Sequence, residues 1–517
     1  MAGTIVDSVT LNFTDLTGAK TGCTSLGSNK FWKGWVEDIG GGMGNFECKW
    51  GPTGEPGSDK GSQRGIPICS ARDQLAKKVK EKVAKGYTRL DTRSDQEEMA
   101  KAAAKGVLVA PDPAPKAVAK TTAASRIFHP EVGRLLGIIY GETSRVVRAG
   151  LSAQAGATAE NPIGNLSDRQ LDLGGSILDE IETFITKALG RECSTNRSQT
   201  IPLIRGVPDS KIIDFTDRFM SNVPRQIGRD QRGRENLHQI VISSFERLDE
   251  QRKFLQLLRD AHLTKDVFQA ASHVTTSGGK EEVWYDGLGC DIDICEPGSA
   301  EYRKVVDIFN NGQSRNNANW WRNGQSTLQV VRVFKFIRKG ADARFQAYSN
   351  RMAAKPGAVG NIMAWHGTRT ENLLGISKVG LLMPENLPRG VHISGKAFGK
   401  GIYHAPCTTG IKTICGFPTD GTNGALKSMN YTSAQGAYYG SGNTSRSAFM
   451  YLQDVALGIA DVRTSACWDK ARPDDWPRKD FIYACATKNS GGFTHDEMVT
   501  FDQDAQTFRY LLEIETR

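Results

Sequence analysis

Three short segments in the last third of the chain hold most of the residues whose types could do chemistry. They cover residues 365–369, 398–403 and 496–499, and a fourth segment, 427–431, lies between the second and the third. Together they offer one histidine, two tyrosines, a small hydroxyl and a carboxylate, without the Cys/His spacing of a metal site. These residue types favour binding a nicotinamide dinucleotide and cleaving its glycosidic bond over hydride or phosphoryl transfer.

The chemistry of that cleavage explains the residue types. The bond between nicotinamide and ribose breaks through an oxocarbenium-like centre, whose positive charge a carboxylate such as Glu497 can stabilise. The same carboxylate can activate an acceptor hydroxyl. A tyrosine ring and a few polar groups can orient the flat nicotinamide, and a glycine beside a histidine lets the backbone approach the ligand closely. This chemistry requires no metal.

The segments resemble the catalytic domain of the poly(ADP-ribose) polymerase family, whose signature is a spaced His, Tyr and Glu. The resemblance implies NAD+ as substrate and a site without a metal. It makes Glu497 the catalytic glutamate, His366 the residue that anchors ribose, and Tyr403 the residue that closes one side of the pocket. It also implies that the backbone of Gly367 holds the carboxamide, with Thr368 completing the first motif in the NAD+ site.

The resemblance extends to the fourth segment, with two departures beside the glutamate. Ser428 matches the carboxamide-binding serine and Tyr431 the tyrosine that stacks on nicotinamide. Asp496 and Met498 stand where the family has Asn and Tyr. We expect Met498 to lie near the acceptor side, where it would bear on chain elongation.

Length and composition bound the rest of the molecule. A chain of 517 residues is expected to hold two to four domains. Its net charge of +9 includes a lysine cluster in residues 77–85, which indicates either a polyanionic partner or a solvated helix face. The ten cysteines are scattered without a pairing pattern, as is typical of free thiols in a reducing compartment.

No run of the sequence reaches membrane-spanning length, and the N-terminus has no signal pattern. We therefore expect an intracellular protein without a membrane partner. The resemblance implies a nuclear location in a eukaryotic cell, and the cytoplasm or nucleoid if the source is microbial or viral.

Residues 1–91 predict a small β-rich domain with a hairpin at the glycines 40–42 and a helix near 70–86. The pattern resembles the WGR domain of the same family, which contacts DNA ends or nicks. Pro52 replaces the arginine of that motif. We expect Trp50 to contact DNA, with Lys60 or Arg64 in place of the missing arginine. Residues 92–124, rich in Ala, Lys and Pro, are expected to be a linker.

Residues 125–278 have helical periodicity and predict an all-α bundle. The apolar spacing is clear around Val132 and Leu178, and less regular over the run from Ile240 to Leu248. Asp209 is predicted to cap a helix that Pro224 closes. The bundle resembles the helical regulatory domain of DNA-dependent family members and implies control of NAD+ binding. Simple support of the catalytic domain is the alternative.

Residues 279–517 predict a mixed, mainly antiparallel sheet. The predicted strands are 330–337, 361–365, 454–457, 481–485 and 507–514. The fold class is therefore a multidomain α+β protein with a WGR-like domain, a helical bundle and an ADP-ribosyltransferase domain.

The function implied is DNA-dependent transfer of ADP-ribose from NAD+ to protein acceptors, including the protein itself, and to earlier ADP-ribose units. The resemblance leaves room for an accessory factor. Three alternatives stay open: a mono-ADP-ribosyltransferase, an NAD+ hydrolase, and an inactive scaffold that binds DNA or ADP-ribose.

Overall fold

The structure is a computed structural model, which describes residues 4–15, 28–52, 57–90, 128–151, 166–189, 197–203, 208–224, 240–272, 274, 279–311, 328–383, 397–399, 401–407, 447–466, 479–485 and 496–516. Contacts divide the chain into two units. One holds 1–120, 144–269 and 388–392, and the other holds 121–143, 270–387 and 393–517. The predicted linker lies largely outside the described residues, and the four domain bounds predicted from the sequence stay predictions.

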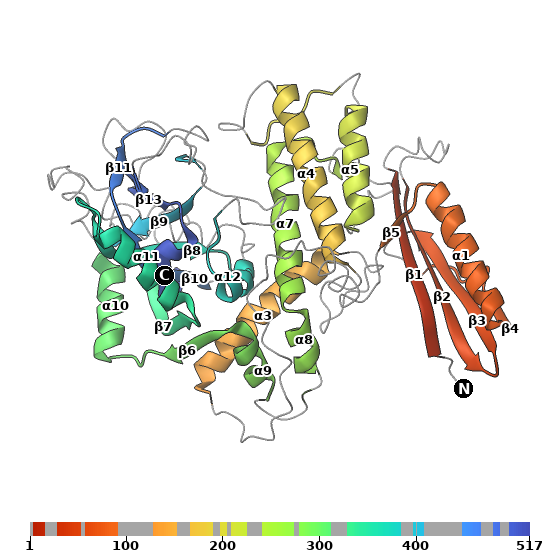
Figure 1. Cartoon of the computed structure of the whole chain (residues 1–517), viewed down its shortest axis with the longest axis horizontal. Helices are drawn as coiled ribbons and strands as arrows, with labels where there is room; N and C mark the ends of the chain where they lie inside the picture. The colour runs from red at the N-terminus through yellow and green to blue at the C-terminus, as the bar shows by residue number, and fades with distance from the viewer. Residues whose placement is uncertain are drawn as a thin grey trace. The chain divides into compact units, whose positions relative to one another are not determined.

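The N-terminal part is a five-stranded antiparallel sheet with one helix on its apolar face (Figure 1). The elements are β1 (Thr4–Asp15), β2 (Ser28–Gly40), β3 (Met43–Pro52), β4 (Gln63–Pro67), α1 (Ile68–Ala84) and β5 (Thr88–Leu90), with strand order β4-β3-β2-β1-β5. Gly41 and Gly42 form the two-residue turn between β2 and β3 with φ of 63° and 75°, which favours glycine. The predicted hairpin and helix are confirmed.

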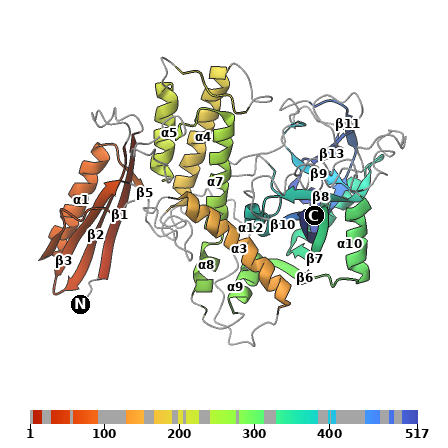
Figure 2. The ribbon, with the colours of Figure 1, turned by 180° about the vertical axis from the view of Figure 1, so that it is seen from behind.

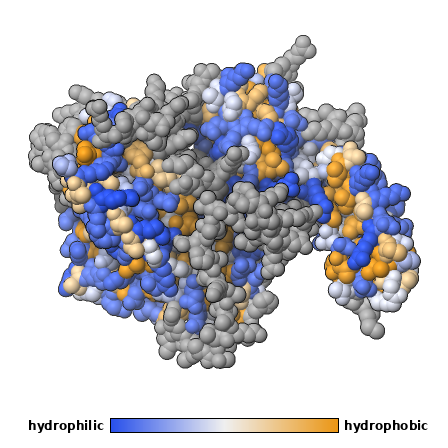
Figure 3. Space-filling view, viewed as in Figure 1, coloured by the Kyte–Doolittle hydropathy of each residue, from blue (hydrophilic) through white to orange (hydrophobic). Residues whose placement is uncertain are grey.

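One face of this sheet forms a core beneath α1, whereas on β1 the side chains of both faces are buried from Val9 to Asp15. Leu11, Val36 and Phe46 are buried against Leu75 of the helix. Figure 3 shows hydrophobic and hydrophilic residues intermixed over this part of the chain. None of the described helices is long and apolar enough to cross a membrane.

The predicted helical segment forms α3 (Pro130–Gly150), α4 (Asp168–Leu189), α5 (Ser210–Asn222), α7 (Phe245–Leu263) and α8 (Lys265–Ser272). Apolar residues such as Leu178, Phe219 and Leu255 form a common core. The side chain of Asp209 accepts a hydrogen bond from the Lys211 amide, 2.8 Å away, and α5 ends just before Pro224, as predicted.

One helix boundary differs from the sequence prediction. The helical run predicted from Ile240 begins only at Phe245, because Ser244 caps α7 by accepting a hydrogen bond from the Arg247 amide. Ile242 instead lies in the irregular segment before α7, where it is fully buried in the helical core.

Helix α5 also packs against the N-terminal sheet within the same unit. The Asn12 amide donates to the Met220 carbonyl at 3.2 Å, and the Thr14 backbone N–H donates to the Ser221 hydroxyl at 3.2 Å. Both bonds are buried and join residues about two hundred positions apart, so local sequence patterns do not predict them.

The C-terminal part is built on a nine-stranded sheet of order β11-β12-β13-β9-β8-β10-β14-β7-β6. Its strands are β6 (Cys290–Ile294), β7 (Leu328–Arg338), β8 (Gly360–Thr368), β9 (Ile402–Pro406), β10 (Ser447–Leu457), β11 (Ala460–Arg463), β12 (Phe481–Ala484), β13 (Glu497–Thr500) and β14 (Gln506–Thr516). Neighbouring strands are antiparallel except for β11 and β12. The mainly antiparallel sheet and its five predicted strands are confirmed.

Helices cover this sheet on both sides. They are α9 (Gly279–Leu288), α10 (Ala300–Asn311), α11 (Ala341–Ala353) and α12 (Leu373–Val379), seen from behind in Figure 2. Phe309 of α10 packs edge-on against Trp365 of β8 on one face. On the other face, the Ser377 hydroxyl of α12 lies 3.0 Å from the hydroxyl of Tyr451, which pairs with His366, the residue after Trp365. The sheet that carries the predicted catalytic residues is thereby packed between helices.

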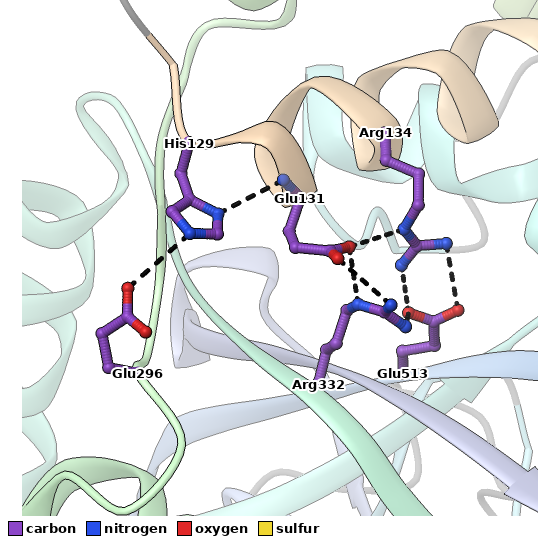
Figure 4. Close-up of polar contacts among 6 residues, drawn as sticks. All are labelled: His129, Glu131, Arg134, Glu296, Arg332 and Glu513. Atoms are coloured by element: carbon purple, nitrogen blue, oxygen red, sulfur yellow. Dashed lines mark hydrogen bonds and ion pairs between the residues drawn. The ribbon is translucent and has the colours of Figure 1, made fainter.

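The first half of α3 belongs to the unit that contains this sheet. Arg134 forms ion pairs with Glu131 and with the buried Glu513 of β14, while Arg332 of β7 pairs with the same two carboxylates (Figure 4). The Arg332 Nη1 to Glu513 Oε2 distance is 3.1 Å. Two arginines thus share two carboxylates, which fixes the start of α3 on the sheet.

Two further contacts hold the same half of α3. The Tyr140 hydroxyl donates to the Trp284 carbonyl at 2.9 Å, and the two rings stack. The Thr143 hydroxyl donates to the carbonyl of Glu371, at 3.0 Å. Glu371 follows His366 by five positions, so α3 is bonded to the segment that continues the first motif.

Candidate active site

The three residues of the predicted signature lie on three adjacent strands. Glu497 opens β13, Tyr403 lies on β9 and His366 on β8, and these strands are neighbours in the order β13-β9-β8. Tyr403 pairs with Val499, so Glu497, two positions from Val499, lies on the same side of the sheet as Tyr403. Residues spread over about 130 positions are therefore brought onto three neighbouring strands of one sheet.

His366 is joined directly to the strand of Tyr403. Its Nδ1 lies 3.0 Å from the Tyr403 carbonyl oxygen. A carbonyl only accepts, so Nδ1 carries the proton and Nε2 has a lone pair to accept from a hydroxyl. Burial lowers the pKa of His366, although the Tyr403 carbonyl opposes this shift, and the ring stays neutral at pH 7.

The hydroxyl of Tyr403 is used within the protein. It donates to the Gly399 carbonyl at 2.9 Å and accepts from the Phe398 amide at 3.0 Å. Gly399 has φ of 86°, a conformation that favours glycine. The glycine-containing second motif thus fixes the tyrosine, and the ring itself is the part available to a ligand.

Glu497 is a half-buried carboxyl group that forms no side-chain hydrogen bond or ion pair with another residue that the structure describes. Loss of solvent raises its pKa from 4.5 to about 7. A carboxyl group in this state is suited to stabilise positive charge that develops beside it, or to accept a proton near neutral pH.

The neighbours of Glu497 have structural roles. Asp496 is fully buried and accepts a hydrogen bond from the Tyr483 hydroxyl of β12 at 2.7 Å. Met498 is fully buried in the core with Ala364 and Tyr483, on the opposite side of β13 from Glu497. The expectation that Met498 lies near the acceptor side is therefore wrong, because strand alternation turns it inward.

The remaining residues predicted for the NAD+ site are only partly described. Gly367 and Thr368 follow His366 on β8, and the Thr368 hydroxyl accepts a hydrogen bond from Asn372 at 3.3 Å. Ser428 and Tyr431 lie outside the described residues. Among the described residues, no group of His, Cys, Asp and Glu could hold a metal ion.

The residues predicted to contact DNA are not all brought together. Trp50 is 42% exposed, and its indole N–H donates to the Lys60 carbonyl at 3.0 Å. Arg64 is instead paired with the buried Glu47, at 2.5 Å, so its charge is partly neutralised. Pro52 faces the exposed Lys30 across the β2–β3 ladder. The glycine turn fixes the register that brings Lys30 opposite Pro52.

Comparison with known proteins gives three family matches along the chain. Residues 7–94 match the WGR domain, 128–282 the poly(ADP-ribose) polymerase regulatory domain, and 299–420 the poly(ADP-ribose) polymerase catalytic domain.

Curated relatives agree with these matches at low identity. Poly [ADP-ribose] polymerase 1 of Gallus gallus is 23% identical over 257 residues, 49% of this chain and 21% of the relative. Poly [ADP-ribose] polymerase 2-A of Oryza sativa is 24% identical over 309 residues, which are 60% of this chain and 37% of the relative. Poly [ADP-ribose] polymerase of Drosophila melanogaster is 22% identical over 380 residues, and the match covers 68% of this chain and 31% of the relative. The chain thus matches well under half the length of these relatives.

Proposed function

We propose that this chain, which belongs to the poly(ADP-ribose) polymerase family, is a DNA-responsive ADP-ribosyltransferase that uses NAD+ as its substrate. It releases nicotinamide and transfers ADP-ribose to protein acceptors, itself included, and to ADP-ribose already attached. The observation that carries this proposal is the placement of His366, Tyr403 and Glu497 on three adjacent strands.

Each of these residues has a role that fits its surroundings. His366 Nε2 accepts a hydrogen bond from a ribose hydroxyl, because the Tyr403 carbonyl holds the proton on Nδ1. The Tyr403 ring closes one side of the pocket, and Glu497 stabilises the oxocarbenium-like transition state while it activates the acceptor hydroxyl. Gly367, Ser428 and Tyr431 hold the nicotinamide, as in the family motif.

The state of Glu497 gives a prediction for the dependence of activity on pH. Burial raises the pKa of this group to about 7, and the reaction needs the carboxylate. We therefore expect kcat/KM for nicotinamide release to rise as the pH increases from about 6 to about 8, with a midpoint near 7. The pH dependence of kcat/KM reports the pKa values of groups in the free enzyme. A profile that is flat over this range would contradict the assigned role.

DNA control is proposed from the WGR-like sheet and the helical bundle. Trp50 is a large exposed aromatic side chain at the end of β3, with the cation of Lys30 in a neighbouring register position. Stacking of such a ring on a nucleotide, together with nearby lysines, is a general mode of nucleic-acid binding. By family analogy the location is the nucleus in a eukaryotic source, or the cytoplasm or nucleoid in a microbial or viral one.

Nicotinamide release with and without nicked or blunt-ended DNA tests this control. We expect DNA to raise the rate by about tenfold or more, and Trp50→Ala to remove most of that rise. Ile39→Ala is the matched control, because Ile39 is 44% exposed on the same sheet but lies at the opposite end of β2. A rate that DNA leaves unchanged would make the protein a DNA-independent transferase.

A further inference from the structure

A buried histidine follows Tyr403 on β9, and the residues after it in this strand are apolar. His404 is 3% exposed, between Tyr403 and Ala405 on β9. A buried imidazole is costly unless both nitrogens have partners. Both have: Nδ1 lies 2.7 Å from Gln453 Nε2 of β10, and Nε2 lies 2.9 Å from the Thr500 hydroxyl of β13.

These groups belong to a longer chain of hydrogen bonds whose direction is fixed at one end. Gln506 Nε2 donates to the backbone carbonyl of Gln503 at 2.7 Å, which turns its Oε1 toward Thr500. The Thr500 hydroxyl donates its one proton to that oxygen at 3.3 Å. It must therefore accept from His404 Nε2–H, which leaves His404 Nδ1 to accept from Gln453. The hydrogen bonds therefore run in one direction, from Gln453 to His404, from His404 to Thr500 and from Thr500 to Gln506.

The chain lies where the backbone ladder between β8 and β9 ends. In this ladder Ala364 pairs with Pro406 and Trp365 pairs with Ala405, whereas β9 continues to pair with β13 as far as Ile402. His404 is beyond the last pair with β8. From there its side chain reaches β10, the strand on the far side of β8.

Two groups of strands are joined in this way. Glu497 and Tyr403 lie on β13 and β9, and His366 lies on β8, which is paired with β10. Thr500 is on the same short strand as Glu497, and Gln453 is on the strand that pairs with β8. Apolar side chains of the same shape could fill this space without needing hydrogen bonds in a particular direction. The polar set specifies one arrangement instead.

We propose that His404, with Gln453, Thr500 and Gln506, is a positioning device that sets Tyr403 and Glu497 relative to His366. This inference rests on the proposed function, because it assigns the network a role in that reaction. His404 itself does not touch the substrate. It acts through the strands that carry the residues that do.

Thr500→Val and Thr500→Ser test the proposal as a matched pair, because only serine keeps the hydroxyl that links His404 to Gln506. We expect Thr500→Val to lower kcat for nicotinamide release by about tenfold to a hundredfold, with KM for NAD+ changed less than about threefold. Thr500→Ser should restore kcat to near the wild-type value. Equal kcat values in the two variants would overturn the proposal.

Hydrogen–deuterium exchange gives a readout that does not depend on activity. In Thr500→Val, the amides of 402–407 and 497–500 should exchange faster than in Thr500→Ser, while those of β6 and β7 are unchanged. Uniformly faster exchange would mean a general loss of stability and would contradict a positioning role. If Thr500→Val fails to fold, Gln453→Met tests the other end of the chain by the same two readouts.

The two proposals fail in different ways. If the wild-type protein releases no nicotinamide, the proposed function is wrong, and the exchange data alone decide whether the network holds these strands. If the wild-type protein is active and Glu497→Gln is not, but Thr500→Val keeps full kcat, the function stands and the positioning role is wrong.

Discussion

Replacing Glu497 with glutamine is expected to lower the rate of ADP-ribose transfer by about a thousandfold while changing NAD+ affinity by only a few fold. Glutamine keeps the shape of the side chain but cannot carry the negative charge that stabilises the oxocarbenium-like transition state. No described residue forms an ion pair with this carboxyl group, so the substitution leaves no charged partner uncompensated among them.

The same substitution should make the protein slightly more stable above pH 7. The pKa of Glu497 is raised in the folded state from 4.5 to about 7, so the folded protein binds a proton that the unfolded chain has lost between these pH values. Stability therefore falls as the pH rises through this window, and the glutamine variant would avoid that loss. The measurements are single-turnover transfer, NAD+ binding and thermal melting over the pH range from 4.5 to above 7.

Glu282→Gln is the control, because Glu282 is a partly exposed glutamate of α9, away from the three strands that carry the signature residues. It should keep the wild-type rate and the wild-type dependence of melting on pH. Transfer by Glu497→Gln within about tenfold of the wild-type rate would remove Glu497 from the catalytic role.

The second large effect concerns the ion pairs that hold α3 on the sheet. Glu513→Gln is expected to lower the free energy of unfolding of this unit by about 2–3 kcal/mol, because it removes the buried carboxylate that Arg134 and Arg332 share. We place the loss below that of a fully buried pair because both arginines also contact Glu131 and are partly exposed.

Lys335→Gln is the matched control on the same strand as Arg332. Lys335 forms an exposed pair with Glu301 at 3.5 Å, so its loss should change stability by less than about 1 kcal/mol. Denaturant unfolding of the full chain, followed by a probe in the sheet, measures both variants. Equal stability of the two variants would show that the buried pairs contribute no more than a surface pair.

The parts of the fold set by local patterns could be predicted from the sequence. The glycine turn at 41–42, the Asp209 cap and the strand at 507–514 follow from backbone conformation, capping and alternation. Their short motifs identify His366, Tyr403 and Glu497, but none of the predicted strands contains them, so their places on β8, β9 and β13 come from the structure.

Contacts between distant residues could not be predicted in this way. Arg134 and Glu513 are 379 positions apart, and nothing near either one in the chain indicates the other. His404 had a local signal, a polar residue in a largely apolar strand, but its partners lie on β10 and β13 and depend on the sheet order. The inward position of Met498 required the pairing of β13 with its neighbours.

The most direct test of the central claim is incubation of the purified full chain with labelled NAD+, with and without broken DNA, followed by a denaturing gel. The predicted result is label on the protein, running as a high-molecular-weight smear that DNA strengthens. The label should be lost in Glu497→Gln. A single sharp band would limit the activity to one ADP-ribose unit. Label found only as free ADP-ribose would make the protein an NAD+ hydrolase, and no reaction despite NAD+ binding would contradict the account.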